Sequence, residues 1–210
     1  MEDKIAAAGG RIVEPEQKYN ILALFGKAGS GKDTIRNKLL ELYPDRYRRL
    51  VSYTTRPPRL GEVEGHTYHF VDPNTFAAKV INFSMLEATC FNVVGDNWFY
   101  GTSIDDLTLD KINVGVFNPT AIEALVQDNR LKVLPIYISC VDKVRLLRQL
   151  EREKNPNCSE ICRRFLADEG DFPGYFSFYY ETIFNSEPIS SSLAIDAINE
   201  YVWNYFGQDN

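Results

Sequence analysis

The segment ILALFGKAGSGKDT, residues 21–34, decides the fold of this chain. An apolar run leads into a glycine-rich turn, and a helical pattern begins directly after Lys32. A strand, such a turn and a helix in this order form a phosphate-binding loop, because the N–H groups of the turn and the positive end of the helix attract phosphate oxygens. We expect Lys32 to reach the β- and γ-phosphates of a nucleotide. The predicted loop consists of Gly26, Lys27, Ala28, Gly29, Ser30, Gly31, Lys32, Asp33 and Thr34.

The rest of the chain alternates apolar, strand-like runs with helical patterns. Core strands are expected at 113–117 and 133–140, and a short strand at 50–53. This alternation predicts βαβ units with a parallel sheet. Together with the loop it indicates the α/β class and a P-loop NTPase core of three α/β/α layers. We expect residues 1–19 to form a flexible extension and residues 20–210 to form one domain.

Apolar positions spaced by three and four residues identify the helix faces that should be buried. Asn118 followed by Pro119 fits a helix start, because Asn is a good N-cap and Pro suits the first helical position. The expected buried positions are Ile35, Leu39 and Leu42 in a helix over 33–42, Val144, Leu147 and Leu150 in the helix after the strand at 133–140, and Ile195, Ile198, Val202 and Phe206 in the last helix.

Composition argues against several classes of protein function. The formal net charge of −6 argues against a protein that coats nucleic acid, since that role needs a basic face. No apolar run reaches the roughly 20 residues that span a bilayer. Four cysteines without a CxxC pair indicate reduced thiols and a cytoplasmic protein, and two histidines make a His-based metal site unlikely to form.

Residues 54–103 differ in character from the core, with two adjacent prolines, several glycines and many aromatics, and we interpret them as a small mixed insert. Arg56 and Arg59 flank Pro57-Pro58, and two guanidinium groups at fixed spacing can clamp one phosphate. An exposed basic turn is the alternative. The aromatic, hydroxyl and acidic residues that follow suit a pocket for a base and a phosphate, or equally the core of a small domain.

The chain resembles the guanylate kinase family from about Asn20 to Val202. The resemblance is carried by the phosphate loop, by SYTTRPPRLGEVEGHTYHF at 52–70 and by WFYGTS at 98–103. It implies a kinase that uses ATP and Mg²⁺ to phosphorylate GMP or dGMP. It also implies a core at 20–53 and 104–210, a nucleoside monophosphate (NMP)-binding insert at about 54–103, and a lid at about 151–164.

The resemblance also implies roles for individual residues. The acceptor phosphate would be held by Arg56, Arg59, Tyr68 and Tyr100, and guanine would be contacted by Ser52, Glu87 and Thr102. Glu87 makes physical sense, because a carboxylate accepts from both N1–H and the exocyclic amine of guanine. Adenine offers no such donor pair and would leave the acid unpaired.

Two arginines of the expected lid fall at or near family positions that contact the transferring phosphates. Arg164 matches the arginine that bridges both phosphates. Arg152 lies near the second one, but the spacing is off by about one residue, and Arg148 is a rival for that role. Lys32, Arg56, Arg152 and Arg164 are therefore the predicted catalytic residues.

Two departures from the family pattern bear on specificity and on Mg²⁺. The acidic pair at the end of the strand over 113–117 is replaced by Val116 and Asn118. The Asn118 carbonyl can still accept from the guanine amine, whereas its NH₂ tolerates other bases; a purely N-capping role is the alternative. The loop reads GKDT, as in viral-type deoxynucleoside monophosphate kinases. We hypothesise that Asp33 supplies the Mg²⁺-side carboxylate lost at Val116.

Two other functions stay open on the sequence. Asn118 and the GKDT loop favour a kinase that accepts several NMPs and dNMPs. A catalytically inactive, guanylate-kinase-like binding module is the other alternative, although such modules typically lose the phosphate loop that this chain retains.

Overall fold

The computed structural model describes residues 18–59, 61–93, 96–152, 154–172, 176–186 and 191–207. The extension predicted over 1–19 lies outside these residues except for its last two positions. Within the described ranges, no helix has the length and apolar character needed to cross a bilayer. All four cysteines are free, as predicted.

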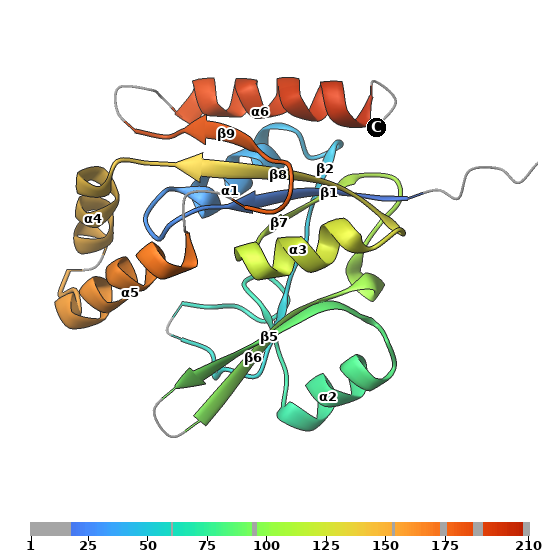
Figure 1. The fold of residues 1–210 in the computed structure, drawn as a ribbon, viewed down its shortest axis with the longest axis horizontal. Coiled ribbons are helices and arrows are strands. Elements are labelled where there is room, and N and C mark those ends of the chain that lie inside the picture. Colours follow the sequence, from blue (N-terminus) through green and yellow to red (C-terminus); the bar gives the residue numbers. More distant parts are fainter. Residues whose placement is uncertain are drawn as a thin grey trace, which may run out of the picture.

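A five-stranded parallel sheet forms the centre of the molecule, with strand order β2-β7-β1-β8-β9 (Figure 1). Its central strand leads directly into the phosphate loop. This arrangement confirms the predicted α/β class with a parallel sheet. The strands are β1 (Tyr19–Phe25), β2 (Tyr47–Arg49), β7 (Ile112–Val116), β8 (Leu131–Ser139) and β9 (Glu181–Phe184).

Helices cover both faces of this sheet because side chains alternate along each strand. Leu22 and Leu24 of β1 join the core under α1 and α6, whereas Ile21 and Phe25 face the opposite core under α3. Figure 1 shows α6 and α3 on opposite sides of the strands. The helices are α1 (Lys32–Leu42), α3 (Pro119–Gln127), α4 (Asp142–Glu151), α5 (Cys158–Asp171) and α6 (Ser191–Phe206).

A second, four-stranded sheet lies on the α3 side of the molecule, with order β4-β3-β6-β5 (Figure 1). It is mixed, since β3 pairs parallel with β4 and antiparallel with β6. Phe76 of α2 is buried, and α2 packs on β5 and β6. The elements are β3 (Tyr53–Thr54), β4 (His69–Phe70), α2 (Pro73–Ile81), β5 (Met85–Val93), β6 (Asp96–Ser103) and a 3₁₀ turn (Ile104–Asp106).

Three local predictions were wrong. Leu42 is 58% exposed because it is the last residue of α1, and Leu147 is 44% exposed because it lies on the side of α4 opposite the buried positions. In α4 the fully covered positions are instead Arg145 and Gln149, which pack toward the phosphate loop. The strand expected at 50–53 is not continuous: the chain leaves the main sheet after β2 and joins the second sheet at Tyr53.

The prediction for the last helix is confirmed. Ile195, Ile198, Val202 and Phe206 are all buried in the core shared with α1 and the sheet. Their spacing places them on one stripe of α6, which is the pattern of a helix packed on one side only.

Candidate active site

The phosphate loop curves between β1 and α1 through backbone conformations that favour glycine. Gly29 and Gly31 have φ angles of 80° and 95°. A Cβ at Gly29 would lie 2.4 Å from the carbonyl oxygen of Arg145, and one at Gly31 would lie 2.3 Å from Nδ2 of Asn185. The neighbouring elements therefore press against the loop, and these two positions have no room for a side chain.

The ammonium group of Lys32 lies inside the curve of the loop. Its Nζ donates to the carbonyl oxygens of Gly26 at 2.6 Å and Lys27 at 3.0 Å. Burial lowers the pKa of Lys32 to about 8, and the charges of Asp33 and Asp168 partly oppose this shift. An ammonium group held at the centre of a curved backbone is placed to meet phosphate oxygens.

Asp33 and Thr34 lie in the first turn of α1, and both are exposed. The Asp33 carboxylate is 2.9 Å from a guanidinium nitrogen of Arg36. Among the described residues no group of three or more His, Cys, Asp or Glu side chains could hold a metal. One carboxylate beside a phosphate site fits Mg²⁺, which is commonly bound by one or two carboxylates, substrate phosphates and water.

Two further side chains support the loop on the side of β9, and no sequence pattern pointed to the first of them. Asn185 donates from Nδ2 to the carbonyl oxygen of Ser30 at 2.7 Å. Arg148 donates to the carbonyl oxygen of Asn185 at 3.1 Å and lies near Gly31. Arg148, the rival considered for a lid role, is thus placed beside the phosphate loop.

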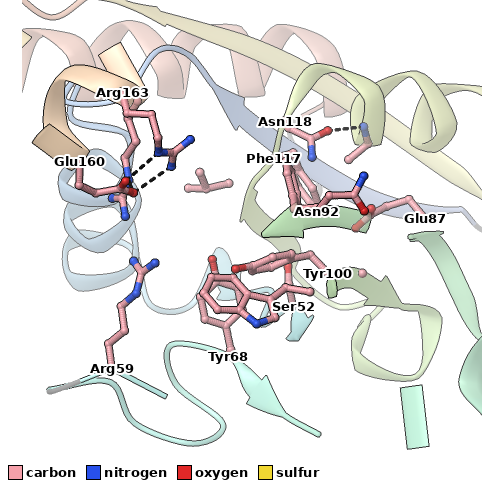
Figure 2. A pocket seen from close by; sticks show the side chains of 16 residues that line it. Ser52, Arg59, Tyr68, Glu87, Asn92, Tyr100, Phe117, Asn118, Glu160 and Arg163 are labelled. Atoms are coloured by element: carbon pink, nitrogen blue, oxygen red, sulfur yellow. Dashed lines mark hydrogen bonds and ion pairs between the residues drawn. The ribbon is translucent and has the colours of Figure 1, made fainter. Parts of the chain in front are cut away.

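A cavity of about 440 Å³ lies between the second sheet, the end of β7 and α5 (Figure 2). It brings together seven of the predicted site residues from distant parts of the chain. These are Ser52, Arg59, Tyr68, Glu87, Tyr100, Asn118 and Arg164.

The basic and phenolic end of this cavity is built around a buried arginine. Arg56 is 3% exposed and donates to the Tyr100 hydroxyl at 3.1 Å and to Glu62 at 2.8 Å. Its guanidinium also lies over the Tyr68 ring. Arg56 does not line the cavity and holds the two tyrosines in position from outside it. Arg59 is exposed and faces the cavity.

The opposite end carries an acid. The Thr102 hydroxyl donates to Oε1 of Glu87 at 2.7 Å, and the Ser52 hydroxyl is 3.4 Å from that of Thr102. Burial raises the pKa of Glu87 to about 7, against the opposing effect of the Thr102 hydrogen bond. Thr102 is fully covered and acts through Glu87, whereas Glu87 and Ser52 line the cavity.

Asn118 is both an N-cap and a residue of the cavity wall. Its Oδ1 accepts from the N–H of Ala121 at 2.7 Å, which caps α3. The residue also lines the cavity, and Figure 2 shows it on the same side as Glu87. The cap uses one of the two lone pairs of the carbonyl oxygen, so the NH₂ group and a partly engaged acceptor are left for a ligand.

Two arginines of the predicted lid share one acid. Glu160 accepts from Nε of Arg163 and from Nε of Arg164, both at 2.7 Å, and these arginines lower its pKa to about 2. All three residues line the cavity (Figure 2). Arg152 is exposed at the end of α4 and is not among the residues lining this cavity.

Several residues of the cavity were missed by the sequence analysis. Phe91, Asn92 and Trp98 come from the β5–β6 pair, and Phe117 follows β7. Two-residue alternation gave a usable signal, because Phe91 and Trp98 are cross-strand partners that continue the faces of Glu87 and Tyr100.

A family model described as guanylate kinase matches residues 18–194, which include both sheets. The chain is 39% identical over 152 residues to a guanylate kinase of Gloeobacter violaceus, and the match covers 70% of each protein. It is 29% identical over 153 residues to Protein PALS1 of Danio rerio, covering 70% of this chain and 22% of that protein. Its fold is similar to that of the guanylate kinase from Anaplasma phagocytophilum, with a TM-score of 0.63, 23% identity and coverage of 90% and 86%.

Proposed function

The chain belongs to the guanylate kinase family, and from this premise we propose that it transfers the γ-phosphate of ATP to GMP or dGMP, giving GDP or dGDP. One observation carries the proposal for the acceptor. A single cavity presents the Glu87 carboxylate at one end and Arg59, with the tyrosine hydroxyls, at the other. This arrangement of an acid at one end and a base at the other matches GMP or dGMP, which has two N–H donors on its guanine and a dianionic phosphate.

On the donor side, Lys32 and the amides of the loop bind the ATP phosphates in this proposal. Phosphoryl transfer needs alignment and positive charge more than covalent chemistry, so a preformed loop supplies much of what catalysis requires. Bound Mg²⁺ would neutralise charge on the phosphate oxygens. Asp33 is the residue we propose to hold it, directly or through water.

On the acceptor side, Arg59, Tyr68 and Tyr100 bind the phosphate of the monophosphate. Arg56 shares this role if one of its present hydrogen bonds opens, and otherwise it positions Tyr100. The base is contacted by Glu87, Ser52 and Asn118, with Thr102 orienting the carboxylate. The acceptor's own phosphate oxygen is the nucleophile, so no side-chain nucleophile is needed.

The lid supplies the remaining positive charge. Arg164 faces the cavity and is the residue we propose to stabilise charge on the transferring group. Arg152 stays the second candidate, since its position at the end of α4 lies within the predicted lid. Closure of the lid and of the insert would exclude water and limit hydrolysis of ATP.

The test is a comparison of kcat/KM for GMP, dGMP, AMP, dAMP, CMP, UMP and dTMP with Mg²⁺ and ATP. A preference for guanine nucleotides by orders of magnitude supports the proposal. A parallel Asp33→Asn variant tests the metal assignment. It is expected to raise the Mg²⁺ concentration needed for half-maximal rate, and an unchanged Mg²⁺ dependence contradicts the role of Asp33.

A broader (d)NMP kinase is the second candidate, and the capping bond of Asn118 favours it. With the carbonyl oxygen engaged by Ala121, the acceptor that guanine's amine would use is weakened. Similar kcat/KM values for several bases would support this alternative. A binding module without catalysis predicts nucleotide binding but no turnover with any acceptor, and the intact loop around Lys32 argues against it.

A further inference from the structure

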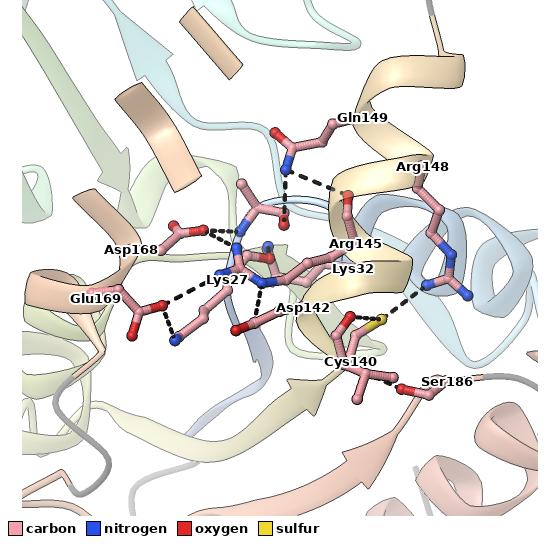
Figure 3. A network of polar contacts seen from close by, with 12 residues as sticks. Lys27, Lys32, Cys140, Asp142, Arg145, Arg148, Gln149, Asp168, Glu169 and Ser186 are labelled. Carbon is pink, nitrogen blue, oxygen red and sulfur yellow. Dashed lines mark hydrogen bonds and ion pairs between the residues drawn. The ribbon is translucent and has the colours of Figure 1, made fainter. Parts of the chain in front are cut away.

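The middle of the phosphate loop is held by side chains from α4 and α5, the two helices that overlap the ends of the predicted lid. The N–H of Ala28 donates to Oδ2 of Asp168 at 2.9 Å, and the carbonyl oxygen of Ala28 lies 3.4 Å from Nε2 of Gln149. These side chains come from α5 and α4 (Figure 3). Both backbone polar groups of one loop residue, Ala28, are therefore held by tertiary contacts.

Asp168 is itself fixed by a buried arginine. Arg145 is 0% exposed, and its Nη1 lies 2.7 Å from the same Oδ2 that accepts from Ala28. Its Nε pairs with Asp142 at 2.7 Å, and its guanidinium stacks over the Phe165 ring at 3.7 Å. A buried guanidinium is tolerated only when such partners compensate its charge, so Arg145 and Asp168 hold each other in place.

Steric contact ties the same arginine to the loop. The backbone of Arg145 fills the space beside Gly29, where a Cβ would meet its carbonyl oxygen. The loop is thus in close steric contact at Gly29 and hydrogen-bonded at Ala28. The residues that make these contacts have no part in the phosphate binding proposed above. Neither Asp168 nor Arg145 is among the residues that line the acceptor cavity.

We propose that Asp168 is a positioning residue for ATP: with Arg145 it fixes the Ala28 amide and so couples the curvature of the phosphate loop to the packing of α4 and α5. The inference rests on the proposed kinase function. Loop amides bind phosphate well only when they are preorganised. Without the hydrogen bond at Ala28, the loop must become ordered when ATP binds, and this lowers the affinity for ATP. The acceptor cavity is unaffected.

The experiment measures KM for ATP at saturating GMP and KM for GMP at saturating ATP in wild type, Asp168→Ala and Asp168→Asn. We expect Asp168→Ala to raise KM for ATP about tenfold, the loss expected for one charge-assisted hydrogen bond. KM for GMP should stay within about twofold, the tolerance we allow for a site without contact to the mutation. Asp168→Asn keeps an oxygen acceptor and should recover part of the ATP affinity.

Asp142→Ala is the matched control. Asp142 pairs with the same guanidinium at 2.7 Å but, among the described residues, forms no hydrogen bond with the loop, so KM for ATP should stay near the wild-type value. Equal increases in KM for ATP and GMP in Asp168→Ala overturn the proposal. So does an Asp142→Ala variant with the same defect as Asp168→Ala.

A double variant separates positioning from stability. Replacing a buried ion pair by apolar residues of similar size is often neutral for folding, so Arg145→Met with Asp168→Leu should restore the melting temperature lost in Asp168→Ala. It still lacks an acceptor for Ala28, and KM for ATP should remain raised. A double variant with wild-type KM for ATP contradicts the proposal.

Calorimetric titration with ATP alone distinguishes this inference from the kinase proposal. If the wild-type protein phosphorylates no monophosphate, the kinase proposal fails. Weaker ATP binding by Asp168→Ala would still support the role of Asp168, and equal binding by the two proteins would overturn it.

Discussion

The phosphate loop and the acceptor cavity differ in how the chain builds them. The loop is one continuous segment, 26–34, and its polar groups already have partners such as Asn185 and Asp168. The cavity takes its wall from the insert, from the end of β7 and from α5, and its key acid, Glu87, has one hydroxyl partner. The loop is therefore preformed within one segment, whereas the cavity is assembled from distant segments, and mutations in the two should have different effects.

The largest expected effect lies in the loop. Lys32→Ala should lower kcat on the order of 10³-fold, because a buried ammonium that meets transferring phosphate is lost from a preorganised site. KM for GMP should change little, since Lys32 is not part of the acceptor cavity. Steady-state kinetics with both substrates varied measures this split, and a kcat within tenfold of wild type would contradict the assigned role.

The next effect tests whether the lid acts on both regions. Arg164→Ala should lower kcat about 100-fold through loss of charge stabilisation in the transition state. Arg163→Ala is the matched comparison, because Arg163 shares Glu160 but is 66% exposed against 34% for Arg164. Equal losses in the two variants would show that total lid charge matters and that Arg164 has no special position.

The acid of the cavity predicts a loss of activity below pH 7, a range in which Lys32 of the loop stays charged. The carboxylate form of Glu87 accepts from guanine, and its pKa is raised by burial to about 7. kcat/KM for GMP should therefore fall about tenfold for each pH unit below 7. Glu87→Gln serves as the control, because it should remove this limb while leaving the titration of the GMP phosphate in place. An unchanged pH profile in Glu87→Gln would exclude Glu87 as its source.

The same pKa has a consequence for stability with a definite sign. In the unfolded chain the Glu87 carboxyl has the lower pKa of 4.5. The contribution of Glu87 to the stability of the fold is therefore fully present below pH 4.5 and is lost as the pH rises toward 7. Glu87→Gln should consequently raise the melting temperature more at pH 8 than at pH 4. Thermal unfolding at the two pH values measures the difference, and an equal change at both would contradict it.

A smaller effect is expected at the phosphate end of the cavity. Tyr68→Phe should raise KM for GMP about fivefold, because one hydrogen bond to the acceptor phosphate is lost. kcat and KM for ATP should stay close to wild type, in contrast to Lys32→Ala. A fall in kcat alone would place Tyr68 with the catalytic groups and weaken the division between the two regions.

The smallest effect is a gain of specificity. Asn118→Asp should increase the ratio of kcat/KM for GMP over AMP about threefold, since a second carboxylate oxygen accepts from the guanine amine while the first still caps α3. The melting temperature should hold, because Asp and Asn are equivalent N-caps. A lower ratio, or a loss of stability, would show that the amide itself is required.

The sequence alone determined the phosphate loop, the α/β class and the buried face of α6. Each depends on residues close together in the chain, such as the glycines before Lys32 or the spacing of Ile195 and Ile198, and local geometry suffices to interpret them. The family motifs also pointed to residues that the structure gathers in one cavity, including Glu87 and Arg164. Their roles there stay predictions.

Only the tertiary structure decided what surrounds these residues. No spacing relates Asp168 to Ala28, or Arg56 to Tyr100, because these contacts arise when separate elements pack. The same holds for Arg145: a charged residue at a helical position is expected at the surface, yet three acidic partners from α4 and α5 allow it to be fully buried. Charge compensation over long sequence separations is a property of the fold, and the chain order does not reveal it.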